Sequence, residues 1–180
     1  TLVERNKQLG GLALKLKRTL DGQPLVEQVR DLVAKVQAQE NIRVITDALV
    51  VDHEGQAGAF RTGVQSGPSM YYQKIEHGVT ILATGAREYQ PTEYGYGQSD
   101  RVLTQLELED LLAKGDASDP RLASVVMIQC VGSRNPDNPT CGRICCQNAV
   151  KNALWLKDLN PEAQVIVLYR DMRTPYRAED

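Results

Sequence analysis

The chain carries four cysteines, and all of them fall within one short stretch. They follow the pattern C-x10-C-x3-C-C and are Cys130, Cys141, Cys145 and Cys146. A disulfide framework normally spreads its cysteines to join distant loops, and thiols inside a cell stay reduced. Clustered thiols therefore indicate a metal or redox site. The alternative is that they are buried cysteines acting as small hydrophobic residues, which the clustering of all four disfavours.

Four thiolates suit either a zinc ion or an iron–sulfur cluster. A zinc site usually has two separate C-x2-4-C pairs, whereas this chain has one comparable spacing and one adjacent pair, Cys145-Cys146. That difference favours an iron–sulfur cluster modestly and leaves a zinc-stapled structural or interaction domain open. A third hypothesis, a dithiol acting with a flavin on a disulfide substrate, lacks the usual C-x-x-C spacing.

A strand–helix–strand pattern would position these thiols. Residues 124–129 and 164–169 are expected to form buried strands, and a helix is expected from about Cys145 to Leu159, before Asn160-Pro161. This order is typical of a parallel βαβ unit. Another helix is expected at 105–114.

The positions of the cysteines in that unit predict one site. Cys130 ends the first strand, and Cys145-Cys146 begin the helix, where N–H groups and the helix dipole favour thiolate or an anionic cluster. The loop with Pro136 and Pro139 can return Cys141 to the same point. We therefore expect the four sulfurs to converge.

The first hundred residues predict a different arrangement. Apolar residues recur with helical spacing from Leu25 to Val36. Strands are expected at 1–4, 42–46, 48–52, 59–64, 70–76 and 79–83. The segment Val79–Ala83 is apolar enough to lie inside a sheet and ends at Thr84-Gly85. Because residues 86–101 form an irregular connector, we predict two domains, 1–100 and 101–180.

Several residues of the first part are typical of nucleotide-binding folds. Glu4 ends a strand, where an acid can accept hydrogen bonds from ribose hydroxyls. Gly10-Gly11 and Thr84-Gly85 would allow backbone N–H groups to approach a phosphate. Each signal alone is weak, and a solvated charge or a tight turn is the favoured explanation of any one of them. Their order and separation together favour a cofactor site.

Length, charge and composition exclude several classes of protein. The chain has 180 residues, a net charge of -2 and 42% hydrophobic residues, as a globular protein does. Nucleic acid is disfavoured as a partner because phosphate binding needs a basic excess. The apolar runs are too short for a transmembrane segment. We expect a soluble, cytoplasmic protein and, because it begins at Thr1 without Met, a piece of a longer one.

Other polar residues are expected to be ordinary surface groups. His53 and His77 fall at predicted turns without neighbouring ligands. The basic residues Lys15, Lys17 and Arg18 are expected to form a solvated face. Arg134 could bind a phosphate or balance the charge of a cluster, and Arg170, Asp171 and Arg173 are typical of an ion-pair set.

The motifs in this order resemble one family, the flavin-binding A subunits of heterodisulfide reductases. They are Val3-Glu4-Arg5, Leu9-Gly10-Gly11, Thr80–Ala86, Glu93–Gly97, Gln129–Arg134, Cys141–Cys146 and Leu168–Thr174. The resemblance covers essentially all 180 residues. The Cys-Val-Gly-Ser-Arg and C-x3-C-C motifs are specific to that family, whereas the Glu and Ala-Thr-Gly motifs are shared with thioredoxin-reductase-like flavoproteins.

The resemblance implies an α/β fold with a partial FAD-binding Rossmann-like domain and a β-meander, followed by a second Rossmann-like βαβ domain. It implies an electron-transfer oxidoreductase that passes electrons between FAD and a [4Fe-4S] cluster. The partners would be other subunits of the heterodisulfide reductase type, or an electron-donating hydrogenase or dehydrogenase. The first Gly-rich turn does not occur in the 180 residues, so an internal fragment is expected.

The resemblance also implies residue roles. Glu4 would bind the adenosine ribose with Arg5 beside it, and Gly11 would approach the phosphates. Val50 would meet the adenine through its backbone, and Thr84-Gly85 would line the flavin. The cluster ligands would be Cys130, Cys141, Cys145 and Cys146.

Overall fold

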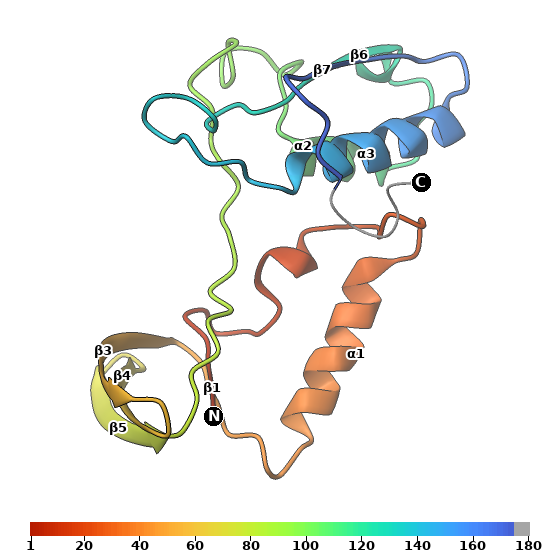
Figure 1. Ribbon diagram of the computed structural model, residues 1–180. Coiled ribbons are helices and arrows are strands. Elements are labelled where there is room, and N and C mark those ends of the chain that lie inside the picture. Colours follow the sequence, from red (N-terminus) through yellow and green to blue (C-terminus); the bar gives the residue numbers. More distant parts are fainter. Residues whose placement is uncertain (175–180) are drawn as a thin grey trace. The chain divides into compact units, whose positions relative to one another are not determined.

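The computed structural model describes residues 1–174, and the chain divides into two compact units (Figure 1). Unit 1 comprises Thr1–Lys15 and Val26–Ala86, and unit 2 comprises Leu16–Leu25 and the chain from Arg87 onward. The units therefore divide at Ala86, before the expected boundary near residue 100. The assignment of a FAD-binding domain to 1–100 and a second Rossmann-like domain to 101–180 stays a prediction.

Unit 1 combines one helix with two small sheets. Its elements are β1 (Leu2–Val3), the 3-10 helix η1 (Gly11–Leu14), α1 (Leu25–Gln37), β2 (Val44–Ile45), β3 (Ala48–Gln56), β4 (Ala59–Ser66) and β5 (Tyr71–His77). Strands β1 and β2 pair in parallel, and β3, β4 and β5 form an antiparallel meander. The predicted helix and meander are thus confirmed. A small core joins the two sheets, in which Ile45, Ala48 and the fully buried Val64 contact Val3 and Ile75.

The strand predicted at Val79–Ala83 is wrong. These residues form no strand, and the side chains of Ile81 and Leu82 are 86% and 84% exposed. A strand is held by hydrogen bonds to a neighbour, and none of the strands within residues 1–174 pairs with this segment. Apolar composition alone therefore could not place it in a sheet.

The prediction that His53 and His77 fall at turns is also wrong, whereas the exposed position expected of a surface histidine is confirmed for His53. His53 lies within β3 and His77 ends β5, and the Thr62 hydroxyl of β4 lies between them. That hydroxyl is 2.7 Å from His53 Nδ1 and 2.7 Å from His77 Nε2. The antiparallel register places the three residues in neighbouring positions on adjacent strands, which the chain order does not reveal.

Unit 2 contains the predicted parallel βαβ arrangement. Its elements are α2 (Gln105–Leu112), the 3-10 helix η2 (Pro120–Leu122), β6 (Ser124–Ile128), α3 (Cys145–Leu159) and β7 (Gln164–Leu168). Strands β6 and β7 pair in parallel, from Ser124 opposite Gln164 to Ile128 opposite Leu168. The protein is therefore an α/β protein with a Rossmann-like βαβ unit, as predicted.

The core of unit 2 lies where both helices meet the sheet. Its buried members are Leu108, Leu111, Leu112, Leu122, Met127, Ala149, Trp155, Leu156 and Ala163. Residues of the opposite alternation remain open, since Val126 is 52% and Ile166 51% exposed. No helix within residues 1–174 has the length and apolar character needed to cross a membrane.

Candidate functional site

The predicted cluster ligands lie beyond the carboxyl end of β6 and at the start of α3. The sheet ladder continues one residue past β6, because the Gln129 N–H donates to the Leu168 carbonyl at 2.9 Å. Cys130 follows with a φ of 62°, a left-handed conformation that turns the chain out of the strand. Cys145 and Cys146 are the first two residues of α3. Open α/β sheets bind ligands outside the carboxyl ends of their strands, so the location suits a site.

Three of the thiols form one neighbourhood. Burial raises the pKa of Cys145, while the backbone amide of Cys130 acts in the opposite direction, and the thiols of Cys146 and Cys130 raise it further. Cys146 is buried at 3% exposure. Desolvation is the largest of these causes, so in the free chain the pKa of Cys145 lies above its ordinary value.

Cys141 is not among the groups that shift the pKa of Cys145. Its sulfur accepts a hydrogen bond from the Arg143 backbone N–H at 3.4 Å, and its charge contributes to the raised pKa of Arg173, whose main cause is Asp171. Within residues 1–174, no three thiol, imidazole or carboxylate side chains are grouped to hold one metal ion. The predicted convergence of four sulfurs is thus not realised in this conformation, and the ligand set stays a prediction.

Arginine side chains surround the cysteine region. Arg134 forms an ion pair with Asp171, and its Nη1 lies 4.0 Å from the Cys130 sulfur. Asp171 also accepts from Arg173 Nε at 2.5 Å, and these two contacts lower the pKa of its carboxyl, with the Arg173 contact the larger cause. Arg170 donates to the Arg134 carbonyl. The predicted ion-pair set after β7 therefore includes Arg134 and joins the ends of both strands next to Cys130.

Two residues that no sequence motif singled out shape the loop between Cys130 and Cys141. The ring of Tyr89 lies against Gly132, whose φ of 70° and missing side chain allow that approach. Asn138 Nδ2 donates to the Gly132 carbonyl at 3.0 Å. The run of Asn and Pro residues signals a turn, but no sequence pattern links Tyr89 to it.

The donor chemistry of this region fits an iron–sulfur cluster. The thiols of Cys130, Cys145 and Cys146 affect one another's ionisation, and the side chains near Cys130 and Cys141 include the cations Arg134 and Arg173. Cationic surroundings favour thiolate ligands and an anionic cluster. The remaining requirement is that the four sulfurs come together, because within residues 1–174 no three of them are grouped to hold one metal ion.

The residues predicted to bind FAD all belong to unit 1. Glu4 follows β1, and one of its carboxylate oxygens accepts from the backbone and side-chain amides of Asn6 at 2.7 and 2.8 Å. Its carbonyl accepts from the Ala48 N–H at 3.0 Å, which places Glu4 beside the start of β3 and near Val50. Arg5 is exposed.

The glycines have different roles. A side chain at Gly10 would collide with Leu14 and Val29, so this residue is needed where η1 meets α1, whereas Gly11 is exposed and open. Val50 is 56% exposed at a register shift in β3. Thr84 and Gly85 are exposed and, within residues 1–174, make no hydrogen bond to Glu4 or Val50. The structure places Glu4 beside the start of the strand that carries Val50, and the role of each of these residues stays a prediction.

Proteins with similar sequences are named as A subunits of heterodisulfide reductases, the family that the motifs resemble. The chain is 39% identical over 114 residues to the A subunit of the H(2):CoB-CoM heterodisulfide,ferredoxin reductase of Methanothermobacter thermautotrophicus, covering 56% of this chain and 17% of that protein. It is 36% identical over 145 residues to the iron-sulfur A subunit of the CoB–CoM heterodisulfide reductase of Methanocaldococcus jannaschii, covering 69% and 22%. No family model matches the chain.

These comparisons confirm the resemblance inferred from the motifs. The chain is a homologue of the A subunits of heterodisulfide reductases and spans about a fifth of the length of the relatives that it matches, 17% and 22% for the two above.

Proposed function

We propose that this chain is part of an electron-transfer oxidoreductase of the heterodisulfide reductase type. Its role would be to pass electrons between FAD and a [4Fe-4S] cluster. The observation that carries the proposal is the placement of Cys130, Cys145 and Cys146 at the carboxyl end of a parallel strand and the start of the next helix. The names of the relatives, one of them an iron-sulfur protein, support it.

Cys130, Cys141, Cys145 and Cys146 would hold the cluster, which when bound supplies a one-electron carrier. The chain's own contribution is to exclude water from Cys146, which is buried, and to provide compensating charge. Arg134 lies next to the Cys130 sulfur and is kept there by Asp171. Cationic groups near cluster sulfurs stabilise the more negative, reduced state.

Unit 1 would contribute to FAD binding. Glu4 has one carboxylate oxygen bonded to Asn6, so its second oxygen would accept from the ribose hydroxyls. Arg5 and Gly11 are exposed and would face the phosphates, Val50 would meet the adenine, and Thr84-Gly85 would line the flavin. Electrons would come from or go to other reductase-type subunits, a hydrogenase or a dehydrogenase.

Metal analysis of the reconstituted chain tests the proposal. After anaerobic incubation with iron and sulfide, the wild type should bind about four irons per chain, the content of one cubane, and absorb broadly in the visible. Cys145→Ser should lose most of the iron and the absorption. Ser133→Ala, in the same loop but without a thiol, is the matched control and should retain both.

Zinc supplied in the same way distinguishes the structural alternative. If the chain binds one zinc tightly and retains no acid-labile sulfide, the electron-transfer proposal is wrong. The same conclusion follows if all four cysteine variants keep full iron content.

A further inference from the structure

Asp171 joins two arginines that lie near two different thiols. One of its carboxylate oxygens forms an ion pair with Arg134, and the other accepts from Arg173 Nε at 2.5 Å. Arg134 Nη1 lies 4.0 Å from the Cys130 sulfur, within the range of an N–H···S hydrogen bond. Asp171 is the main cause of the raised pKa of Arg173, to which the charge of Cys141 also contributes. One carboxylate therefore connects the surroundings of both thiols.

Arg134 is fixed through its backbone as well as through its side chain. Its φ of 56° is left-handed, a conformation that is uncommon for a residue other than glycine. Its carbonyl accepts from Arg170, and its guanidinium donates to Asp171, so both partners come from the segment that follows β7. The side chain is only 20% exposed, and water therefore screens its charge incompletely. The segment after β7 thus decides where this cation lies.

Asp171 can affect the thiols only through its arginines. Among the hydrogen bonds of residues 1–174, the Cys130 sulfur accepts from Arg134 and the Cys141 sulfur accepts from the Arg143 N–H. Asp171 bonds to neither sulfur. A carboxylate alone would oppose the reduction of a nearby cluster, because reduction adds a negative charge. Since this carboxylate is paired with two guanidiniums, the group as a whole carries an excess positive charge.

We propose that Asp171 is a positioning residue that raises the reduction potential of the predicted cluster by holding Arg134 beside Cys130 and Arg173 near Cys141. The inference rests on the proposed function, because it requires a cluster bound by these cysteines. The potential of an iron–sulfur cluster depends on nearby charge and on hydrogen bonds to its sulfurs. The two guanidiniums supply both, and Asp171 keeps them in place, as partners of groups around a metal site commonly do.

A redox titration of the reconstituted chain tests the two arginines. The cluster is poised at defined potentials under anaerobic conditions, and the EPR signal of its reduced state is followed. Arg134→Gln should keep the iron but lower the potential. At the midpoint potential of the wild type, the ratio of reduced to oxidised cluster should fall about tenfold, which is about 59 mV for a one-electron couple. Arg173→Gln should change the ratio in the same direction.

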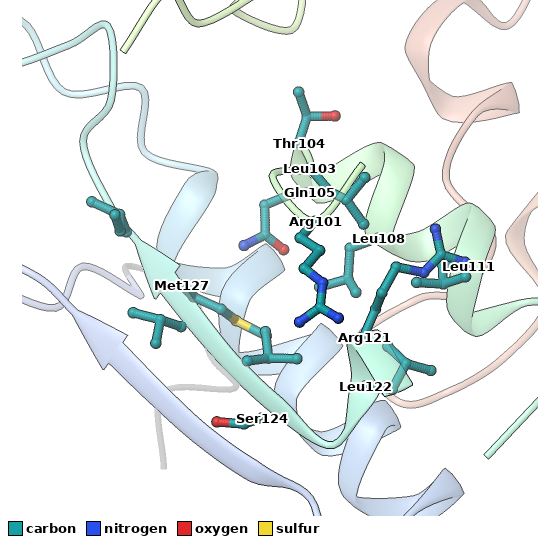
Figure 2. A pocket seen from close by; sticks show the side chains of 13 residues that line it. Arg101, Leu103, Thr104, Gln105, Leu108, Leu111, Arg121, Leu122, Ser124 and Met127 are labelled. Atoms are coloured by element: carbon teal, nitrogen blue, oxygen red, sulfur yellow. The ribbon is translucent and has the colours of Figure 1, made fainter. Parts of the chain in front are cut away.

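Arg101→Gln is the matched control for these variants. Arg101 is an exposed arginine of the same unit and lines the cavity between α2, η2 and β6 (Figure 2). Among residues 1–174, it bonds neither to a cysteine nor to Asp171. Its replacement removes one positive charge from the chain and should leave the ratio of reduced to oxidised cluster unchanged.

Asp171→Asn distinguishes positioning from the charge of the carboxylate itself. Loss of a negative charge alone would raise the potential, whereas loss of positioning lowers it, because Arg134 and Arg173 are no longer held near the thiols. We expect a lower potential. In a chain that also carries Arg134→Gln and Arg173→Gln, the same change should lower the potential no further, because Asp171 acts through those two side chains.

The outcomes separate this inference from the proposed function. A wild type that assembles no cluster would reject both. A wild-type cluster whose potential rises in Asp171→Asn would reject the positioning role alone, and so would equal shifts in the Arg134 and Arg101 variants. If Asp171→Asn retained no iron, the two arginine variants would decide, and an unchanged ratio in both would overturn the inference.

Discussion

Glu109 and Lys151 form a buried ion pair between α2 and α3. Lys151 Nζ lies 2.5 Å from Glu109 Oε1, and the side chains of Lys151 and Glu109 are 6% and 0% exposed. Glu109 Oε2 accepts from the Lys17 backbone N–H at 2.9 Å, and Lys151 also donates to the Arg18 carbonyl at 3.3 Å. The pair thus binds the segment Leu16–Leu25 to the rest of unit 2. In the same segment, the Arg18 guanidinium lies 4.2 Å from the centre of the Trp155 ring.

Removing one member of this pair should destabilise unit 2 strongly. Lys151→Met leaves Glu109 charged and buried, which costs about 3–5 kcal/mol in free energy of unfolding. Asp110→Asn, which removes the exposed Lys17–Asp110 pair at 2.7 Å, should cost less than about 1 kcal/mol. Urea unfolding followed by Trp155 fluorescence measures both. Equal effects of the two variants would show that the buried pair has no special role.

The stability of unit 2 should depend on acid pH through Asp119. Hydrogen bonds from the Arg121 side chain and then from its backbone N–H lower the pKa of Asp119 from 3.8 to about 2. Because the folded pKa lies below the unfolded value, the contribution is complete above pH 3.8 and is lost as the pH falls towards 2. The difference in unfolding free energy between the wild type and Asp119→Ala should therefore shrink between these values. A difference that stays constant from about pH 6 to about pH 2 contradicts the assignment.

Helix α2 depends on its capping box. The Thr104 hydroxyl accepts from the Glu107 N–H at 3.3 Å, and Glu107 accepts from the Thr104 N–H at 2.7 Å. Thr104→Ala should lower the free energy of unfolding by about 0.5–2 kcal/mol. Thr104→Ser keeps the hydroxyl and should recover most of that loss in the same urea titration. If serine were no better than alanine, lost packing of the threonine methyl would explain the effect instead.

The loop after Cys130 should not tolerate a side chain at Gly132. A Cβ there would collide with the ring of Tyr89, and the φ of 70° is left-handed, which costs a non-glycine residue about 1–2 kcal/mol. Gly132→Ala should therefore lower both the unfolding free energy and the iron content after reconstitution. Gly142→Ala, in the same loop with open space around it, is the control. Full iron content in the Gly132 variant would show that the loop does not position the ligands.

Much of the architecture could be predicted from local sequence patterns. The apolar spacing from Leu25 to Val36 predicted α1, and the segment from Cys145 to Asn160-Pro161 predicted α3, because helical periodicity and helix ends depend on residues close in the chain. Two short apolar runs separated by that helix predicted the parallel pair of β6 and β7. The cysteine spacing placed Cys130, Cys145 and Cys146 at the ends of these elements for the same reason.

Only the tertiary structure decided which distant segments meet. The apolar Val79–Ala83 has no neighbouring strand to pair with among residues 1–174, and the guanidinium of Arg18, expected on a solvated face, lies over the Trp155 ring instead. The burial that raises the pKa of Cys145 and the contact of Tyr89 with Gly132 are also tertiary effects. Each depends on contacts between residues far apart in the chain, and periodicity and spacing describe only near neighbours.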